Sequence, residues 1–160
     1  MAYTLEAIIA SHEILAPALS RYPRAVIVPL KASLALIPLT EDLMDEIGTG
    51  HALDRFEHFI PAIRDWIQLL SATGLVAYVE AEFFGGIGSQ SATVWSGGVE
   101  VLAPVHGYDA INQALRALGT RSEPSSDEFD TVGLGRHRHT ASWRDDPTRL
   151  LASSATDPSP

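Results

Sequence analysis

The chain has 160 residues, no cysteine and a formal net charge of −9, with 46% hydrophobic and 19% charged residues. This length fits one domain with a sizeable core, and the composition excludes wholesale disorder. The absence of cysteine excludes disulfide frameworks, thiolate nucleophiles and cysteine-based metal sites.

Charge and hydropathy restrict where the protein acts and what it binds. No apolar run approaches the roughly 20 residues of a membrane span, and no basic residue precedes Arg21, so neither a membrane span nor a signal peptide is expected. These features favour a cytoplasmic protein. The negative charge repels nucleic-acid phosphates and anionic lipid but attracts basic proteins. We therefore expect another protein, a basic one, as the partner rather than nucleic acid or membrane, and self-association stays open.

Apolar runs and turn residues predict the first elements in chain order: a strand, a helix, two short strands and a short acidic helix, over residues 3–10, 12–22, 24–30, 33–39 and 40–47. Pro17 should bend the first helix. A long amphipathic helix is predicted over residues 53–72, with Gly74 as its stop. Residues at spacings of three and four place one of its faces in the core: Phe56, Phe59, Ile60, Ile63, Trp66, Ile67 and Leu70.

The centre of the chain predicts an antiparallel meander of three strands, over residues 75–84, 89–96 and 99–103. The segment Gly85-Gly86-Ile87-Gly88 turns the chain after the first strand, and Gly97-Gly98 makes a tight two-residue turn of the primed kind. A helix over residues 109–119 follows. Together these elements predict the α+β class, with a mostly antiparallel sheet and helices packed on one face. We expect a single domain over residues 1–143 and a tail over residues 144–160 that is flexible or docked on a partner.

Two carboxylates stand out in the predicted strand over residues 75–84. Strand alternation places Glu80 and Glu82 on one face, about 7 Å apart. Such a pair can divide acid and base roles or bind a metal, and Tyr78 and Phe84 beside it would raise a carboxylate pKa on a covered face. A solvent-facing strand surface is the more ordinary interpretation. We predict a function for both residues only if their face is concave or covered.

Two further segments carry residues suited to binding. Gly85 and Gly86 lie in a glycine-rich loop that leads from strand to strand, so a hairpin is favoured over a phosphate site, and Gln90 follows it. The run Arg136-His137-Arg138-His139 offers two imidazoles to a metal, but its arginines oppose a cation. We expect it to form salt bridges with the domain's own acids or to contact a partner. We predict no metal and no cofactor, and assign no catalytic residue.

The stretches Val79-Glu80-Ala81-Glu82-Phe83-Phe84-Gly85-Gly86-Ile87-Gly88-Ser89-Gln90 and Gly133-Leu134-Gly135-Arg136-His137-Arg138-His139-Thr140 resemble segments of small bacterial proteins. No activity is attached to that resemblance. In being small, acidic, cysteine-free and without a catalytic signature, the chain is also similar in composition to immunity proteins that neutralise toxins.

A stretch rich in acids strengthens the expectation of a basic partner: Glu41, Asp42, Asp45, Glu46, Asp54 and Glu57. A solvated helix face is the more ordinary interpretation of these residues. The sequence predicts a protein-binding module, most concretely an immunity-type inhibitor of a basic toxin. The alternative is a small hydrolase or other enzyme that uses Glu80 and Glu82, with a contribution from His137 or His139. The candidate binding residues are Glu41, Asp42, Asp45, Glu46, Glu80, Glu82, Gly85, Gly86, Gln90, Arg136, His137, Arg138 and His139.

Overall fold

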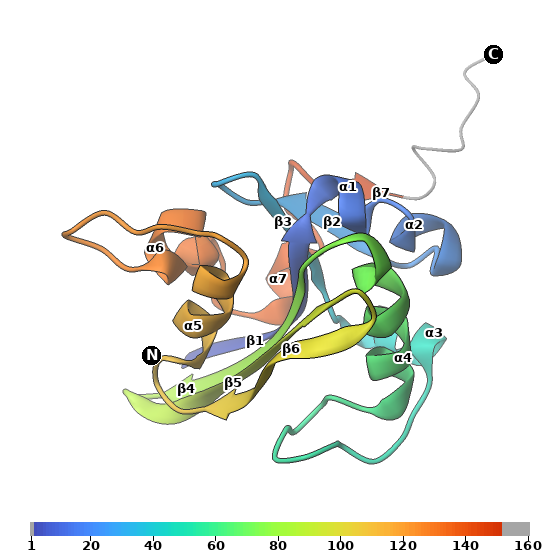
Figure 1. Cartoon of the computed structure of the whole chain (residues 1–160), viewed down its shortest axis with the longest axis horizontal. Coiled ribbons are helices and arrows are strands. Elements are labelled where there is room, and N and C mark those ends of the chain that lie inside the picture. The colour runs from blue at the N-terminus through green and yellow to red at the C-terminus, as the bar shows by residue number, and fades with distance from the viewer. Residues whose placement is uncertain (1, 152–160) are drawn as a thin grey trace.

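The computed structural model describes residues 2–151, which form a seven-stranded sheet with helices around it (Figure 1). The strand order is β6-β5-β4-β1-β3-β2-β7, and every neighbouring pair is antiparallel. The strands are β1 Ala2–Ser11, β2 Val26–Pro29, β3 Leu34–Pro38, β4 Val76–Phe84, β5 Ile87–Ser96, β6 Val99–His106 and β7 Leu150–Leu151. The α+β class and the antiparallel sheet are therefore confirmed.

Helices cover both faces of the sheet rather than one. The central strand β1 is buried on both sides: Leu5 and Ile9 lie in one core, and Ile8 and Ala10 lie in the other. A strand that is apolar at consecutive positions needs cover on both faces. The carboxylates that alternate with apolar residues in β4 predict that one face of the sheet is exposed to solvent. That prediction is wrong, because helices and a loop from distant parts of the sequence cover this face as well.

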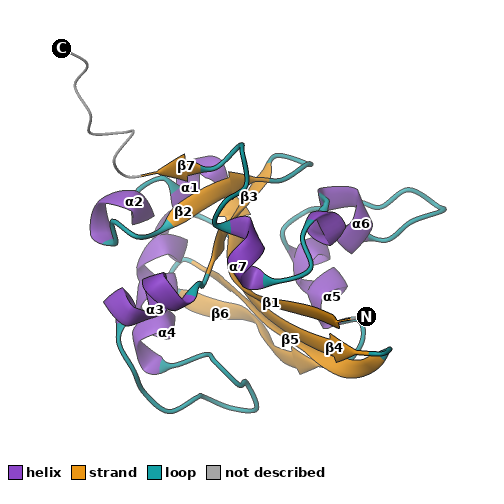
Figure 2. Cartoon of the chain, turned by 180° about the vertical axis from the view of Figure 1, so that it is seen from behind, coloured by secondary structure: helices purple, strands orange, loops and turns teal. Residues whose placement is uncertain are grey.

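The two helical layers come from different parts of the chain (Figure 2). The core of Ile8 is covered by α1 His12–Leu15, α2 Ala18–Arg21, α3 Glu41–Ile47 and α4 Pro61–Leu70. The opposite core is covered by α5 Ala110–Ala117, α6 Glu128–Val132 and α7 Thr140–Trp143. Two 3-10 turns, η1 Ser71–Thr73 and η2 Leu134–Arg136, complete the elements. No helix within residues 2–151 is long and apolar enough to cross a membrane.

The predicted helix over residues 53–72 is shorter than expected, because α4 begins at Pro61. Proline lacks an N–H and disfavours the helical conformation in the residue before it, and Ile60 is extended, with φ −96° and ψ 163°. Residues 48–60 form a long loop between α3 and α4 (Figure 1). Phe56 and Phe59 are nevertheless buried in this loop, with ring centroids 5.4 and 4.5 Å from the ring of Tyr78. The prediction that both rings lie in the core is confirmed, but the prediction that they lie in a helix is wrong.

Residues 144–151, which we expected to belong to a tail, pack on the domain. Leu150 and Leu151 pair with Ile27 and Val26 of β2, which makes β7 an edge strand. The buried Asp146 binds residues of the preceding segment. The ordered domain therefore extends at least to Leu151, and the rest of the predicted tail, residues 152–160, lies outside the described residues.

The meander turns as its glycines require. The β4–β5 turn consists of Gly85 and Gly86, with φ of 59° and 82°, so β5 begins at Ile87 rather than at residue 89. The β5–β6 turn consists of Gly97 and Gly98, with φ of 62° and 78°. Positive φ at both central residues is the primed geometry that matches the strand twist.

Candidate functional site

Polar side chains form a row across four neighbouring strands on one face of the sheet. Glu6 of β1 lies opposite Glu80 of β4, Glu80 lies opposite Ser91 of β5, and Ser91 lies opposite His106 of β6. Direct cross-strand partners project to the same face. The row lies on the same face of the sheet as Tyr78, which packs against Phe56 of the 48–60 loop. This loop and α4 cover the part of the face around Tyr78.

Glu80 anchors the 48–60 loop to this row. Its Oε1 accepts a hydrogen bond from the backbone N–H of Glu57 at 2.8 Å, and its Oε2 accepts one from His58 at 2.7 Å. The Tyr78 hydroxyl also donates to Oε2. Burial, and then the charge of Glu80, raises the pKa of Tyr78 well above its ordinary value, so the phenol stays protonated as a donor. Glu80 is 6% exposed, and both of its oxygens are occupied by the fold.

Glu6 lies directly beside Glu80 and is less fully compensated. Its Oε1 is 3.5 Å from Nε2 of His58, and its Oε2 accepts a hydrogen bond from Thr140 at 3.1 Å. Burial raises the pKa of Glu6 above its ordinary value, and the charges of Glu80 and Glu82 raise it further, whereas His58 and Thr140 oppose the rise. Like charges on adjacent strands repel. This end of the row therefore favours a positive charge.

Ser91, His106 and Asp54 have the residue types of a catalytic triad. Oγ of Ser91 lies 2.6 Å from Nδ1 of His106, and Nε2 of His106 lies 3.8 Å from the Asp54 carboxylate. However, the cavity at Ser91 measures about 60 Å³, which suits one or two waters, and Glu6 and Glu80 also line it. Two carboxylates oppose the oxyanion that acyl transfer creates. These contacts connect the loop to β6 rather than build a nucleophile.

Toward the end of the β4–β5 hairpin the same face of the sheet is uncovered. Glu82 is exposed there, and Phe84 and Ile87 lie directly opposite each other, 59% and 78% exposed. Glu82 and the exposed Glu57 both line the small cavity at Glu6. We call these five residues, Glu6, Glu57, Glu82, Phe84 and Ile87, the open sheet face. It combines an apolar pair with carboxylates on one surface.

Part of the predicted acidic stretch binds other residues of the fold. Asp42 of α3 forms an ion pair with Arg144, which follows α7. The Glu46 carboxylate accepts a hydrogen bond at 2.8 Å from the backbone N–H of Arg24. Both acids therefore attach α3 to neighbouring segments, although the Asp42 side chain stays half exposed.

The remaining acids of that stretch are exposed. Asp54 faces His106, at the 3.8 Å noted above. Within the described residues the carboxylates of Glu41, Asp45 and Glu57 form no hydrogen bond or ion pair. The structure thus divides the acidic stretch into acids that hold the fold and acids that face solvent.

The Arg136–His139 segment binds the domain's own residues. Nε of Arg136 and Nε2 of His137 lie 3.2 and 2.7 Å from the same oxygen of Asp146, and both side chains pack on the Trp143 ring. Burial opposes ionisation of Asp146, but hydrogen bonds from Thr148 and His137 and the charge of Arg136 outweigh it. They hold the pKa of Asp146 well below its usual range.

The second half of that segment lies along β1. The carbonyl of Arg138 accepts a hydrogen bond from the N–H of Thr4 at 2.8 Å, and Nδ1 of His139 is 3.3 Å from the Thr4 hydroxyl. His137 and His139 therefore have separate partners. Within residues 2–151 no group of three or more His, Asp or Glu side chains could hold a metal ion.

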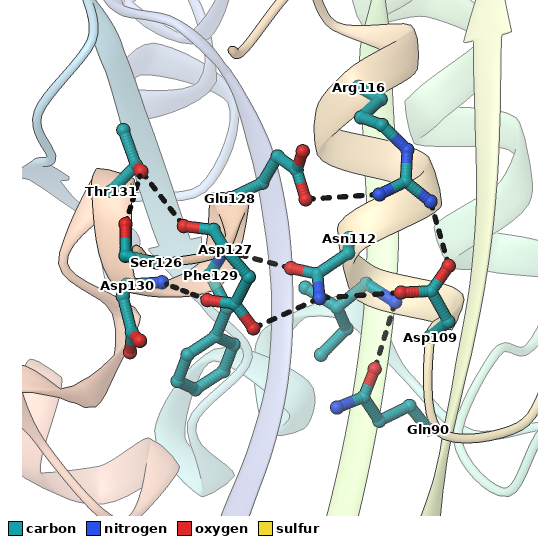
Figure 3. A network of polar contacts seen from close by, with 11 residues as sticks. Gln90, Asp109, Asn112, Arg116, Ser126, Asp127, Glu128, Phe129, Asp130 and Thr131 are labelled. Carbon is teal, nitrogen blue, oxygen red and sulfur yellow. Dashed lines mark hydrogen bonds and ion pairs between the residues drawn. The ribbon is translucent and has the colours of Figure 1, made fainter. Parts of the chain in front are cut away.

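Gln90 also has a place in the fold. Its side-chain oxygen accepts a hydrogen bond from the N–H of Ile111 at 3.0 Å, which ties β5 to the start of α5 (Figure 3). In the same view Arg116 of α5 bridges Asp109 and Glu128, which holds α6 against α5. This network stabilises the helical layer opposite the open sheet face.

Sequence reasoning found Glu80, Glu82 and the hairpin glycines but missed Glu6, His58, Ser91 and His106. The strand register brings Glu6, Ser91 and His106 together, because it places β1 beside the meander of β4, β5 and β6, whereas His58 reaches the row from the 48–60 loop. Comparisons with known proteins gave no match: none was found among models of protein families, curated proteins or solved structures.

Proposed function

We propose that the protein is a protein-binding module for a basic partner, most concretely an immunity-type inhibitor of a basic toxin. The open sheet face carries this proposal. There Phe84 and Ile87, 59% and 78% exposed, form an apolar pair next to the exposed carboxylate of Glu82. Apolar side chains that are exposed next to one another mark interaction sites, whereas apolar residues scattered singly over a surface do not.

The open sheet face has an apolar centre and charged surroundings, as protein interfaces do. Binding energy concentrates in a few large side chains that become desolvated, and surrounding charges set specificity and association rate. Phe84 and Ile87 supply the apolar centre, and Glu57 and Glu82 supply the charged surroundings. These carboxylates select a partner with lysine or arginine at the matching positions.

The net charge of −9 supports the inhibitor form of the proposal. A toxin that acts on nucleic acid or another polyanion needs a basic surface. A compact acidic protein that covers this surface competes directly with the substrate. Its attraction also speeds association, which an inhibitor of a toxin made in the same cell requires.

The enzyme hypothesis gains no support from the geometry. Both oxygens of Glu80 accept hydrogen bonds from the fold, and His137 binds Asp146. Glu82 is exposed and forms no hydrogen bond or ion pair within residues 2–151. A general acid or base needs a substrate pocket, and the cavity that Glu80 and Glu82 line measures only about 60 Å³.

Affinity capture from an extract of the source organism tests the proposal. At low salt the immobilised protein should retain a stoichiometric partner of high pI, which high salt releases. Expressing that partner alone should arrest growth, and co-expressing this protein should restore it. A captured partner that is acidic, or whose expression is harmless, would contradict the inhibitor proposal.

A further inference from the structure

A larger hollow lies on the other side of the Glu57–His58 segment, between α3 and the 48–60 loop. It measures about 270 Å³, and its walls include Met44 and Asp45 of α3 and Glu57, His58 and Ile60 of the loop region. Glu57 and His58 also line the small cavity of the open sheet face. We call this larger hollow the α3 cleft, and the Glu57–His58 segment separates it from the small cavity of the open sheet face.

The α3 cleft combines two kinds of surface. The half-buried Met44 supplies most of the apolar contact area, with the buried Ile60 beneath it, whereas Asp45 and Glu57 supply exposed carboxylates that have no partner within the described residues. On the same helix, Asp42 and Glu46 are already bound to Arg144 and to the backbone of Arg24. Of the exposed acids without a partner in this region, Asp45 and Glu57 line the hollow and Glu41 does not.

We propose that the α3 cleft receives an arginine side chain of the basic partner, an inference that rests on the proposed function. An arginine carries a long apolar stem, which fits against Met44 and Ile60. Its guanidinium ends in five N–H groups in one plane, which can reach carboxylates on two walls at once. Asp45 and Glu57 provide those carboxylates.

Other occupants fit this cleft less well. A hydrated divalent ion needs more oxygen ligands than two carboxylates supply, and it gains nothing from an apolar wall. A lysine ammonium is a strongly hydrated point charge that pairs with one carboxylate more readily than it bridges two. A volume of about 270 Å³ suits a single side chain better than a drug-sized ligand.

Nuclear magnetic resonance with small probes tests the inference on the whole chain. Titration with N-acetyl-arginine amide at low salt should shift the backbone amides of Gly48, Thr49 and Gly50, which line the cleft, in a saturable way. N-acetyl-citrulline amide has the same shape without the charge and should bind about tenfold more weakly, as should the lysine amide. Shifts of equal size for all three probes would overturn the proposal.

Matched variants separate the cleft from general acidity. Asp45→Asn with Glu57→Gln should abolish the saturable shifts, whereas Glu41→Gln with Glu100→Gln should preserve them. The control pair removes the same two charges from exposed positions outside the cleft. If the control pair abolishes the shifts equally, the arginine binds the net charge and not the cleft.

The captured partner then distinguishes this inference from the proposed function. Asp45→Asn, which leaves every residue of the open sheet face in place, should weaken partner binding about tenfold. If the partner binds this variant with full affinity, the α3 cleft is not its arginine site, although the proposed function stands. If the arginine amide fills the cleft but the captured partner is acidic, the proposed function fails, and so does the assignment of the arginine to a basic partner.

Discussion

Glu80 and Glu82 lie two residues apart on β4 and have opposite environments. Glu80 is 6% exposed and accepts hydrogen bonds from two backbone N–H groups and one phenol. Glu82 is exposed at the open sheet face. A carboxylate accepts hydrogen bonds at both oxygens, so Glu80 can bind the adjacent backbone N–H groups of Glu57 and His58 at the same time. Glu80 therefore stabilises the fold, and Glu82 is available for binding.

We expect Glu80→Gln to lower the free energy of unfolding by about 2 kcal/mol, because an amide accepts at only one atom and leaves one of the two part-buried loop N–H donors unpaired. Urea unfolding followed by circular dichroism measures this change. Glu82→Gln is the matched control and should stay within about 0.5 kcal/mol of wild type. Equal effects of the two substitutions would show that Glu80 does not hold the loop.

Asp146→Asn should destabilise the protein by about 2–3 kcal/mol at neutral pH, since it removes the buried charge that Arg136 and His137 share. The pKa of Asp146 is lowered in the fold, so its stabilisation is present above the ordinary range of an aspartate, near 3.8. It is lost as the pH falls through the folded pKa below that range. The difference in urea midpoint between wild type and variant should therefore shrink below about pH 4, and a constant difference would contradict this role.

The sequence could identify Glu80 and Glu82 but not their separate roles. Strand alternation gives the face on which a side chain lies, but it does not show how far cover extends along that face. The loop that buries Glu80 comes from residues 48–60, which are not part of the sheet. Glu6 was unremarkable in the sequence because only the register between β1 and β4 places it beside Glu80.

At the scale of elements, the 48–60 loop shows how apolar spacing can mislead. Phe56, Phe59 and Ile60 continue the spacing of α4, yet the backbone there is not helical. Pro61 prevents the helix from extending backward. Glu80 instead holds the loop, and a backbone hydrogen bond of 2.7 Å from Leu53 to the carbonyl of Phe59 closes it.

Trp66→Ala should lower the free energy of unfolding by about 3–5 kcal/mol, because Trp66 is fully buried in α4 and leaves a cavity. Its ring also contacts Tyr22, with centroids 4.8 Å apart. Leu69→Ala is the control on the same helix, since Leu69 is 61% exposed, and it should change stability by less than about 1 kcal/mol. An unchanged urea midpoint for Trp66→Ala would show that α4 does not pack as described.

At the scale of the whole molecule, one face of the sheet is divided into a covered and an open half. The loop and α4 bury the inner half around Tyr78, and the hairpin end at Phe84 stays open. Turn glycines and alternating strands were enough to predict the meander. The second helical layer and the place of residues 144–151 depend on contacts between distant segments, for which local patterns carry no signal.

Long-range attraction should control how fast a partner binds. Exposed charges are screened over about 8–10 Å, so the association rate with a basic partner should fall steeply between low and physiological salt. At low salt, the double variant Glu57→Lys with Glu82→Lys should associate more slowly than wild type. Its association rate should also depend less on salt, with the fold intact by circular dichroism. Asp42→Lys with Glu46→Lys is a poorer test, because those acids hold α3 to Arg144 and Arg24. An association rate that does not change with salt in stopped-flow measurements would show that Glu57 and Glu82 do not attract the partner.

The affinity of the captured partner for hairpin variants tests the central claim, that the open sheet face is the binding surface. Phe84→Ala with Ile87→Ala should weaken binding by about 2 kcal/mol or more, roughly 30-fold in Kd by calorimetry, because the apolar pair supplies the desolvated centre. Leu69→Ala removes an equally exposed apolar side chain from α4, outside that face, and should leave the Kd unchanged. Wild-type affinity in the hairpin double variant would contradict the proposed surface.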